Sequence, residues 1–349
     1  MASSTARTSS FCRSVSGENP TQNHYFKSGP NGTLFISSGI PDLDKVMGGG
    51  FTLGSLVMIM EDAEAPHHML LLRNFMSQGL VHHQPLLYAA PFPSPAGFLG
   101  TLPAPALPAN DRSQAGDPEE GKNLRIAWQY KKYFAAGNSI PKEVSQEYCN
   151  EFDLRKPLER NFISNQRIEC LSFNNFSDLN AVKTRCQAFF SQQLRDDATC
   201  RVVIQSLCAP QSPHCYKEWE TLGFLRWLKM SIQANKGVAV VSFPPSLLSP
   251  SFSARLQHVA DVVLSVRAIQ DDDKEMAKLL TGYNEMIGFV NVHKVSRPTS
   301  QVPLSLESTT FSMKLHKRRF LFLECLNQAP VDGASSSCST SSNQNSFQF

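Results

Sequence analysis

Few of the features that mark a specialised protein class occur in this 349-residue sequence. Its nine cysteines form no Cys-x-x-Cys pair, which argues against a zinc ribbon or a dithiol redox motif. No apolar run reaches the roughly 18 residues that a membrane-spanning helix needs, so no membrane partner is expected. The net charge of +3 is too small to indicate a dense nucleic-acid-binding surface. The hydrophobic content of 41% instead predicts a chain that buries one sizeable core.

Low-complexity segments bound the expected core on both sides. Residues 1–32 are rich in Ser, Thr, Gly and Asn and indicate a disordered N-terminal tail. An organelle-targeting segment within residues 1–17 is the alternative, because Arg but no acidic residue occurs there. The Ser-rich residues 328–349 indicate a second disordered tail. A single domain is therefore predicted over residues 33–327, with a proline-rich surface insertion at 91–121.

Short apolar runs alternate with helical periodicity in this domain, which predicts an α/β fold with a mostly parallel β-sheet flanked by helices. The predicted buried strands are Ser55–Met60, Leu86–Ala90, Arg201–Leu207, Val238–Phe243 and Val262–Val266. Helical stripes run over 69–76 with Gly79 as the expected stop, over 179–189, and over 222–232 before Gly237. Two later runs, Ile287–Val295 and Phe320–Leu326, are expected to be consecutive antiparallel strands.

The most informative motif lies just before the first predicted strand. It contains Gly39-Ile40-Pro41-Asp42-Leu43-Asp44 and, four residues later, Gly48-Gly49-Gly50. This arrangement resembles the entry to ATPase domains of the RecA and KaiC type. The resemblance implies a RecA-like fold in which a phosphate-binding loop follows the first strand.

That loop would have the form G-x-x-x-x-G-K-[ST], because glycine lets backbone N–H groups approach phosphate and lysine neutralises its charge. This sequence has instead Glu61-Asp62-Ala63-Glu64-Ala65-Pro66-His67-His68. Neither glycine is present, the lysine position holds His67, and the hydroxyl position holds His68. The acidic side chains would repel phosphate. The sequence predicts a degenerate loop that binds no nucleotide in its own pocket.

Two further positions point the same way. KaiC-like domains carry catalytic glutamates after the second strand, where this chain has Phe92 and Pro93. The acid that supports magnesium is replaced by Gln205, which cannot supply an anionic ligand. We therefore expect no enzyme activity and no catalytic residue in this chain.

Two histidine pairs, His67-His68 and His82-His83, flank one predicted helix. They lack cysteine or carboxylate partners at a recognised ligand spacing, so no metal site is predicted. Exposed polar residues at the helix ends are the preferred interpretation.

Three more segments narrow the resemblance: Leu102–Pro105, Arg125–Tyr130 and Phe152–Arg155. With the degenerate loop, they make the chain similar to the family of the fourth Elongator subunit. The resemblance implies a hexameric ring with subunits 5 and 6, attached to core subunits 1 to 3, in cytoplasm and nucleus. Such a ring would bind tRNA and support modification of the wobble uridine, U34, to 5-carbonylmethyl-type side chains. ATP would lie at subunit boundaries, and this subunit would be non-catalytic.

Several side chains are candidates for contacts in such a ring. RecA-like rings hold nucleic acid with loops that correspond here to 208–216 and 244–257, and the nearest candidates for phosphate contact are Lys217 and Arg255, although each also fits an ordinary solvated side chain. Trp128 and Tyr130 alternate in sequence and are interpreted as packing at a subunit interface. The densest basic cluster could contact a neighbouring subunit's nucleotide or be a charged strand edge, and it contains Lys314, His316, Lys317 and Arg318.

Two other functions remain open from the sequence. One is a divergent ATPase that uses an altered loop, although a largely neutral imidazole such as that of His67 would clamp phosphate poorly. The other is a protein scaffold without RNA contact, which the weak net charge favours.

Overall fold

The computed structural model describes residues 25–29, 32–106, 147–164, 166–176, 178–193, 199–212, 217–269, 285–296 and 309–326. Its centre is a nine-stranded sheet of order β14-β13-β12-β11-β4-β10-β9-β5-β8. The six strands from β11 to β8 pair in parallel, and β12, β13 and β14 extend the sheet in antiparallel fashion. The strands are β4 (Leu56–Met60), β5 (Leu86–Ala90), β8 (Ile168–Ser172), β9 (Arg201–Ile204), β10 (Val238–Phe243), β11 (Val262–Ala268), β12 (Met286–Lys294), β13 (Thr310–His316) and β14 (Phe320–Cys325).

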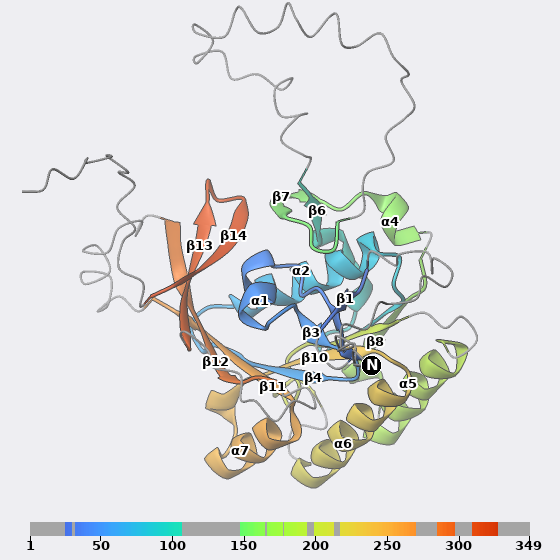
Figure 1. Cartoon of the computed structure of the whole chain (residues 1–349). Coiled ribbons are helices and arrows are strands. Elements are labelled where there is room, and N and C mark those ends of the chain that lie inside the picture. Colours follow the sequence, from blue (N-terminus) through green and yellow to red (C-terminus); the bar gives the residue numbers. More distant parts are fainter. Residues whose placement is uncertain are drawn as a thin grey trace, which may run out of the picture.

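Helices cover both faces of the sheet (Figure 1). On one face lie α1 (Pro41–Val46) and α2 (His68–Val81), and on the other α5 (Leu179–Gln193), α6 (Glu218–Ala234) and α7 (Pro250–Val259). Successive side chains of a strand point to opposite faces, so Val57 joins the α2 core whereas Met58 joins the α6 core. Covering both faces explains why the central strands are continuously apolar.

Two small sheets lie beside the α1 face. The first is formed by β1 (Lys27–Ser28), β2 (Leu34–Ile36) and β3 (Phe51–Thr52), and the second by β6 (Pro103–Pro105) and β7 (Phe152–Pro157). The short helix α4 (Arg160–Ser164) follows β7. The strand β1 lies within the predicted disordered tail, so that prediction is wrong for these two residues, which pair with β2. Residues 1–24 and 327–349 lie outside the described residues.

The predicted fold class, a mostly parallel sheet flanked by helices with antiparallel C-terminal strands, is confirmed. Of the predicted elements, β5 and β10 have the predicted bounds, whereas β9 ends at Ile204 instead of Leu207. The two late strands are not neighbours, because β13 lies between them.

Gly79 does not end a helix, because α2 continues to Val81. A Cβ atom at Gly79 would lie only 2.4 Å from Cδ of Arg201, so this position makes room for a buried arginine. The helix α6 ends as expected near Gly237, although the left-handed residue there is Lys236, with φ of 50°.

The proline-rich segment 91–121 is described only to residue 106, and this part is folded. It contains the 3-10 helix η2 (Pro95–Thr101) and β6, and it buries Leu99 and Leu102 against the α2 core. Among the described residues, no helix has the length and apolarity required to cross a membrane.

Candidate functional site

The Gly39–Asp44 motif is held in place by a buried carboxylate. Asp44 accepts hydrogen bonds from Oγ of Ser37 at 2.6 Å and from the backbone N–H of Ser38 at 2.7 Å. Burial raises the pKa of Asp44, and the serine hydrogen bonds act against this shift. Gly39 has φ of 81°, and a Cβ atom there would lie 2.3 Å from the carbonyl oxygen of Asn74 on α2. The motif therefore fixes the start of α1 against α2.

The loop between β4 and α2 is tied to neighbouring strands by its own acidic side chains. Oε1 of Glu61 accepts a hydrogen bond from Oγ of Ser242, at 2.6 Å, near the end of β10. Oδ2 of Asp62 accepts one from the backbone N–H of Ala268, at 2.6 Å, at the end of β11. A phosphate would have to displace these hydrogen-bonded carboxylates and would meet their negative charge.

The first residue of α2 is His68, whose side chain is buried beside Glu61. Nε2 of His68 lies 3.7 Å from Oε1 of Glu61, while Nδ1 has no hydrogen-bond partner in the described part of the chain. Burial lowers the pKa of His68, although the Glu61 carboxylate opposes this shift. The imidazole is therefore mainly neutral near pH 7. The helix start thus carries a mainly neutral imidazole beside a carboxylate, where a phosphate loop would offer a lysine and a hydroxyl group.

The interpretation of the histidine pairs as exposed helix-end residues is wrong for His68 and His82, and it holds fully only for His83, because His67 is half-buried. His68 and His82 have exposed fractions of 5% and 2%. Nε2 of His82 lies within hydrogen-bond distance of the carbonyl oxygen of Glu147 and of Nε2 of Gln78. These two histidines are buried because the helix ends pack under neighbouring loops, which the sequence pattern does not reveal.

The remaining positions of the expected ATPase site hold groups without acid–base function. Gln205 directly follows β9, and its Oε1 accepts a hydrogen bond from the hydroxyl of Tyr88 on β5. Burial raises the pKa of Tyr88. The ring of Phe92 lies 6.4 Å from that of Tyr88, and Pro93 is exposed beyond β5. No carboxylate replaces the missing acids at these positions.

The basic cluster forms the turn between β13 and β14. Nζ of Lys314 pairs with Glu324 across the two strands, and Nδ1 of His316 lies 3.2 Å from Oε1 of Glu285. Lys317 and Arg318, with φ of 50° and 54°, are exposed at the tip. Non-glycine residues in this left-handed region are strained, and such strain is often found at functional sites.

This turn also contacts β7, which lies far away in sequence. The backbone N–H of Leu154 donates to the carbonyl oxygen of Arg319 at 3.0 Å, and Nε of Arg155 donates to that of Arg318 at 3.2 Å. Because Arg155 and Lys156 are themselves exposed, two distant segments contribute to one basic surface.

One of the two predicted RNA contacts, Arg255, lies against the exposed ring of Trp219, and the other, Lys217, precedes that tryptophan by two residues in sequence. The guanidinium carbon of Arg255 on α7 is 5.1 Å from the ring centroid of Trp219, and Trp219 is 71% exposed at the start of α6. Nζ of Lys217 lies 3.2 Å from Oε2 of Glu220. Sequence reasoning missed Trp219, because the exposure of a side chain in an amphipathic helix follows from packing.

A buried arginine is the other residue that the sequence did not reveal. Arg201 on β9 is fully buried: its Nε donates to Oε1 of Gln84 at 2.7 Å, and one terminal nitrogen donates to the carbonyl oxygens of Ser37 and Phe75, each at 2.9 Å. Burial lowers the pKa of Arg201 to about 9, which leaves the guanidinium charged near pH 7. The predicted interface residues Trp128 and Tyr130 lie outside the described residues.

Fold and loop together define an α/β domain with a mostly parallel sheet, which carries carboxylates and a mainly neutral histidine where a phosphate loop would hold glycine and lysine. The sequence profile of the family described as PAXNEB protein matches residues 19–348, so the chain belongs to this family.

Curated relatives extend over most of the chain. It is 24% identical over 341 residues to Elongator complex protein 4 of Dictyostelium discoideum, which covers 86% of this chain and 76% of the relative. The protein of the same name in Mus musculus is 23% identical over 333 residues, covering 86% and 78%. That of Drosophila melanogaster is 35% identical over 102 residues, covering 28% and 23%.

Proposed function

We propose that this chain is a non-catalytic RecA-like subunit of the Elongator complex, present in cytoplasm and nucleus. It forms a hexameric ring with subunits 5 and 6, attached to core subunits 1 to 3, which binds tRNA and supports modification of U34. The observation that carries the proposal is the similarity, over most of the chain, to relatives named Elongator complex protein 4. Membership of the PAXNEB family supports it further.

The loop between β4 and α2 supports the non-catalytic role. ATP chemistry needs donors and cations that converge on phosphate, and a metal held by an acid. Glu61 and Asp62 are instead engaged with Ser242 and Ala268, and Gln205 replaces the metal-supporting acid. Any ATP in the ring therefore lies at a boundary with another subunit and not in this loop.

The surface around Trp219 supports contact with tRNA. An exposed tryptophan offers a flat face on which an unpaired base can stack, and a neighbouring arginine can contact phosphate. Trp219 and Arg255 have this arrangement, with Lys217 just before α6. The aromatic face adds a binding contribution that does not depend on net charge, which removes the main reason for favouring a scaffold without RNA contact.

The tip of the β13–β14 turn is suited to a contact across a subunit boundary. Lys317 and Arg318 are exposed there, while Lys314 and His316 are paired with Glu324 and Glu285. Cations held at an exposed turn can reach a phosphate on a neighbouring subunit and stabilise its charge. We assign this role to Lys317 and Arg318, with Lys314 and His316 as supporting residues.

The proposal is tested by co-expressing the chain with subunits 5 and 6 and determining the mass of the purified assembly. We expect a ring of six RecA-like domains whose affinity for tRNA falls steeply as salt rises, because phosphate contacts release counterions. A ring without affinity for tRNA would favour the scaffold. Failure to assemble, with ATP turnover by the chain alone, would favour the divergent ATPase.

A further inference from the structure

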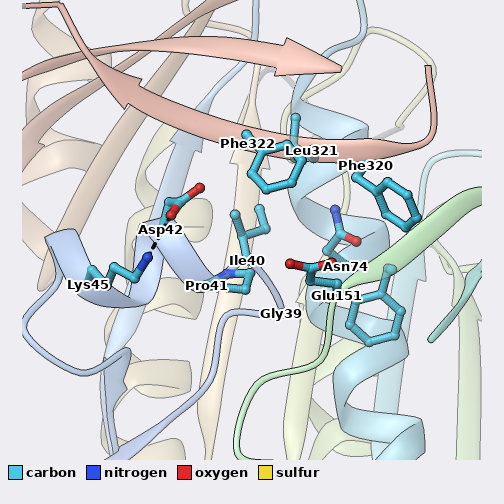
Figure 2. Close-up of a pocket in the computed structure, with 11 residues that line it drawn as sticks. Gly39, Ile40, Pro41, Asp42, Lys45, Asn74, Glu151, Phe320, Leu321 and Phe322 are labelled. Carbon is cyan, nitrogen blue, oxygen red and sulfur yellow. Dashed lines mark hydrogen bonds and ion pairs between the residues drawn. The ribbon is translucent and has the colours of Figure 1, made fainter. Parts of the chain in front are cut away.

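A small cavity lies where four distant segments meet, on the α1 face of the molecule. It has a volume of about 100 Å³ and is lined by the Gly39–Asp42 segment, Asn74 on α2, the start of β7 and residues 320–322 of β14. Figure 2 shows Phe320 and Phe322 on β14 opposite the segment that contains Ile40. A typical small-molecule site has at least roughly 300 Å³. The cavity therefore fits the end of one side chain better than a nucleotide.

Two acceptor groups of this cavity have no partner. Glu151 is an exposed residue at the cavity, and within the described part of the chain its carboxylate makes no hydrogen bond or ion pair. Asn74 is only 2% exposed, and its side-chain nitrogen donates to the carbonyl oxygen of Leu70 at 2.9 Å. Its side-chain oxygen lacks a donor among the described residues, and Figure 2 shows Asn74 beside Glu151 at the cavity. Because Asn74 lines the cavity, a ligand there that donates hydrogen bonds would satisfy this oxygen.

The other charged residues leave the cavity with a net negative charge. Oδ1 of Asp42 lies 3.1 Å from Nζ of Lys45, and Oδ2 accepts a hydrogen bond from the backbone N–H of Leu323 at 3.2 Å. The Lys45 side chain is 78% exposed and neutralises only Asp42. The exposed Glu151 carboxylate is therefore solvated but has no cationic side chain paired with it among the described residues.

Aromatic rings complete the lining, which selects among cations. Phe152, Phe320 and Phe322 all border the cavity. The face of an aromatic ring attracts an organic cation, and a flat guanidinium both stacks on rings and donates several hydrogen bonds in one plane. A metal ion would need more oxygen ligands than one free carboxylate and one amide oxygen supply.

We propose that this cavity is a socket for the guanidinium group of an arginine that a neighbouring subunit presents. The guanidinium donates to the Glu151 carboxylate and to the Asn74 side-chain oxygen, and it stacks against Phe322. The assignment of this arginine to a neighbouring subunit rests on the proposed function. Charge complementarity and the side-chain size of the cavity identify the group itself independently of that function.

The chemical preference is tested with the full-length chain and N-acetyl-arginine amide, followed by ligand-observed NMR. N-acetyl-citrulline amide, a neutral isostere, and N-acetyl-lysine amide serve as comparison probes. We expect Glu151→Gln to weaken binding of the arginine amide about tenfold, because a charged hydrogen bond is lost without a change in shape. The control is Glu159→Gln, an exposed glutamate outside the cavity, which leaves binding unchanged. Phe322→Leu also weakens it, by about threefold or more, because a cation–π contact is lost.

Equal binding of the arginine and citrulline amides would overturn the socket, as would wild-type affinity in the Glu151→Gln variant. A lysine amide that binds as tightly as the arginine amide would overturn the assignment to guanidinium. In the ring assembled with subunits 5 and 6, Glu151→Gln must lower the affinity between subunits, whereas Glu159→Gln must not. An unchanged affinity in Glu151→Gln would overturn the inference that a neighbouring subunit supplies the arginine. Failure of the wild-type chain to assemble would contradict the proposed function, and the amide titration would still decide the chemistry of the cavity.

Discussion

The buried arginine on β9 gives the sharpest prediction about stability. Replacing Arg201 by Met keeps most of the apolar volume but removes the guanidinium. Three acceptors then lose their donor: Oε1 of Gln84 at 2.7 Å and the carbonyl oxygens of Ser37 and Phe75, each at 2.9 Å. The buried Asp44 also loses a favourable charge, since Arg201 and Asp44 attract each other in the same interior region.

The magnitude follows from these losses. Each buried acceptor left without its donor costs about 1–3 kcal/mol, so the loss of three such hydrogen bonds is expected to cost at least about 3 kcal/mol. The total stability of a domain is typically about 5–15 kcal/mol, so the variant should lie close to the limit of folding. The ring stacking of the guanidinium, 4.3 Å from the centroid of Phe75, is lost as well, although a methionine side chain restores part of that contact.

Urea unfolding of the full-length chain, followed by circular dichroism, measures this loss as a lower transition midpoint. The matched control is Arg226→Met, because Arg226 is exposed on α6, and we expect its midpoint to change little. A double variant that adds Asp44→Asn should lose less than the sum of the single losses, because the two charges are coupled. A midpoint for Arg201→Met that matches the control would refute the assigned role of the buried guanidinium.

Three further predictions concern the surface and pH dependence. Trp219→Ala should lower the affinity of the assembled ring for tRNA about tenfold, because the contact with one stacked base is lost. The control is Met230→Ala, since Met230 is equally exposed on α6, and it should leave the affinity unchanged. Fluorescence anisotropy measures the binding of tRNA in both variants. Arg318→Gly should relieve the left-handed backbone at this turn and raise the unfolding free energy by about 0.5–1 kcal/mol, as measured in thermal melts. The same change should weaken the proposed contact with phosphate on the neighbouring subunit. A loss of stability would count against strain at this turn. Burial lowers the pKa of His82 to about 4, and the nearby charge of Arg201 is a smaller cause of the same shift. Between about pH 4 and the ordinary imidazole pKa of 6.5, the folded chain therefore binds fewer protons than the unfolded chain. Stability should therefore fall by up to about 3 kcal/mol as pH drops through this window, and His82→Gln should flatten the dependence of the urea midpoint on pH.

The central sheet was predictable because a strand that is buried on both faces has a simple sequence pattern, a short run of apolar residues. The strands β4, β5, β10 and β11 are short, mostly apolar runs, and the helices between them show a period near 3.6 residues. The antiparallel strand β13 was missed although it also carried a signal. Phe311 and Met313 alternate towards the core, but this period of two is short and runs directly into the basic residues of the turn, which are typical of a charged edge.

Buried polar groups could not be predicted from local patterns. Arg201 begins a strand that reads as apolar, and its hydrogen-bond partners lie at positions 37, 75 and 84. A short-range pattern contains no information about contacts over such separations. For the same reason the sequence interpreted Gly79 as a helix end, although its absent side chain makes room for Arg201.

Some features of the candidate sites could also be predicted from local sequence, whereas others depend on contacts between distant segments. The degenerate loop at 61–68 is visible in sequence, because a phosphate loop requires particular residues at fixed spacing. The ties from Glu61 to Ser242 and from Asp62 to Ala268 depend on the order of strands in the sheet. The cavity beside Glu151 is less predictable still, because the four segments that form it are spread along the chain from Gly39 to Phe322.

The most direct test of the account is the binding of Mg-ATP to the purified, full-length chain in isolation, measured by calorimetry together with phosphate release. We predict no saturable binding and no turnover, because Glu61 and Asp62 are hydrogen-bonded where phosphate would bind and no cation replaces the missing lysine. One-to-one binding of ATP that is lost on substitution of His67 and His68 by Ala would contradict the account, since the loop would then bind phosphate after all.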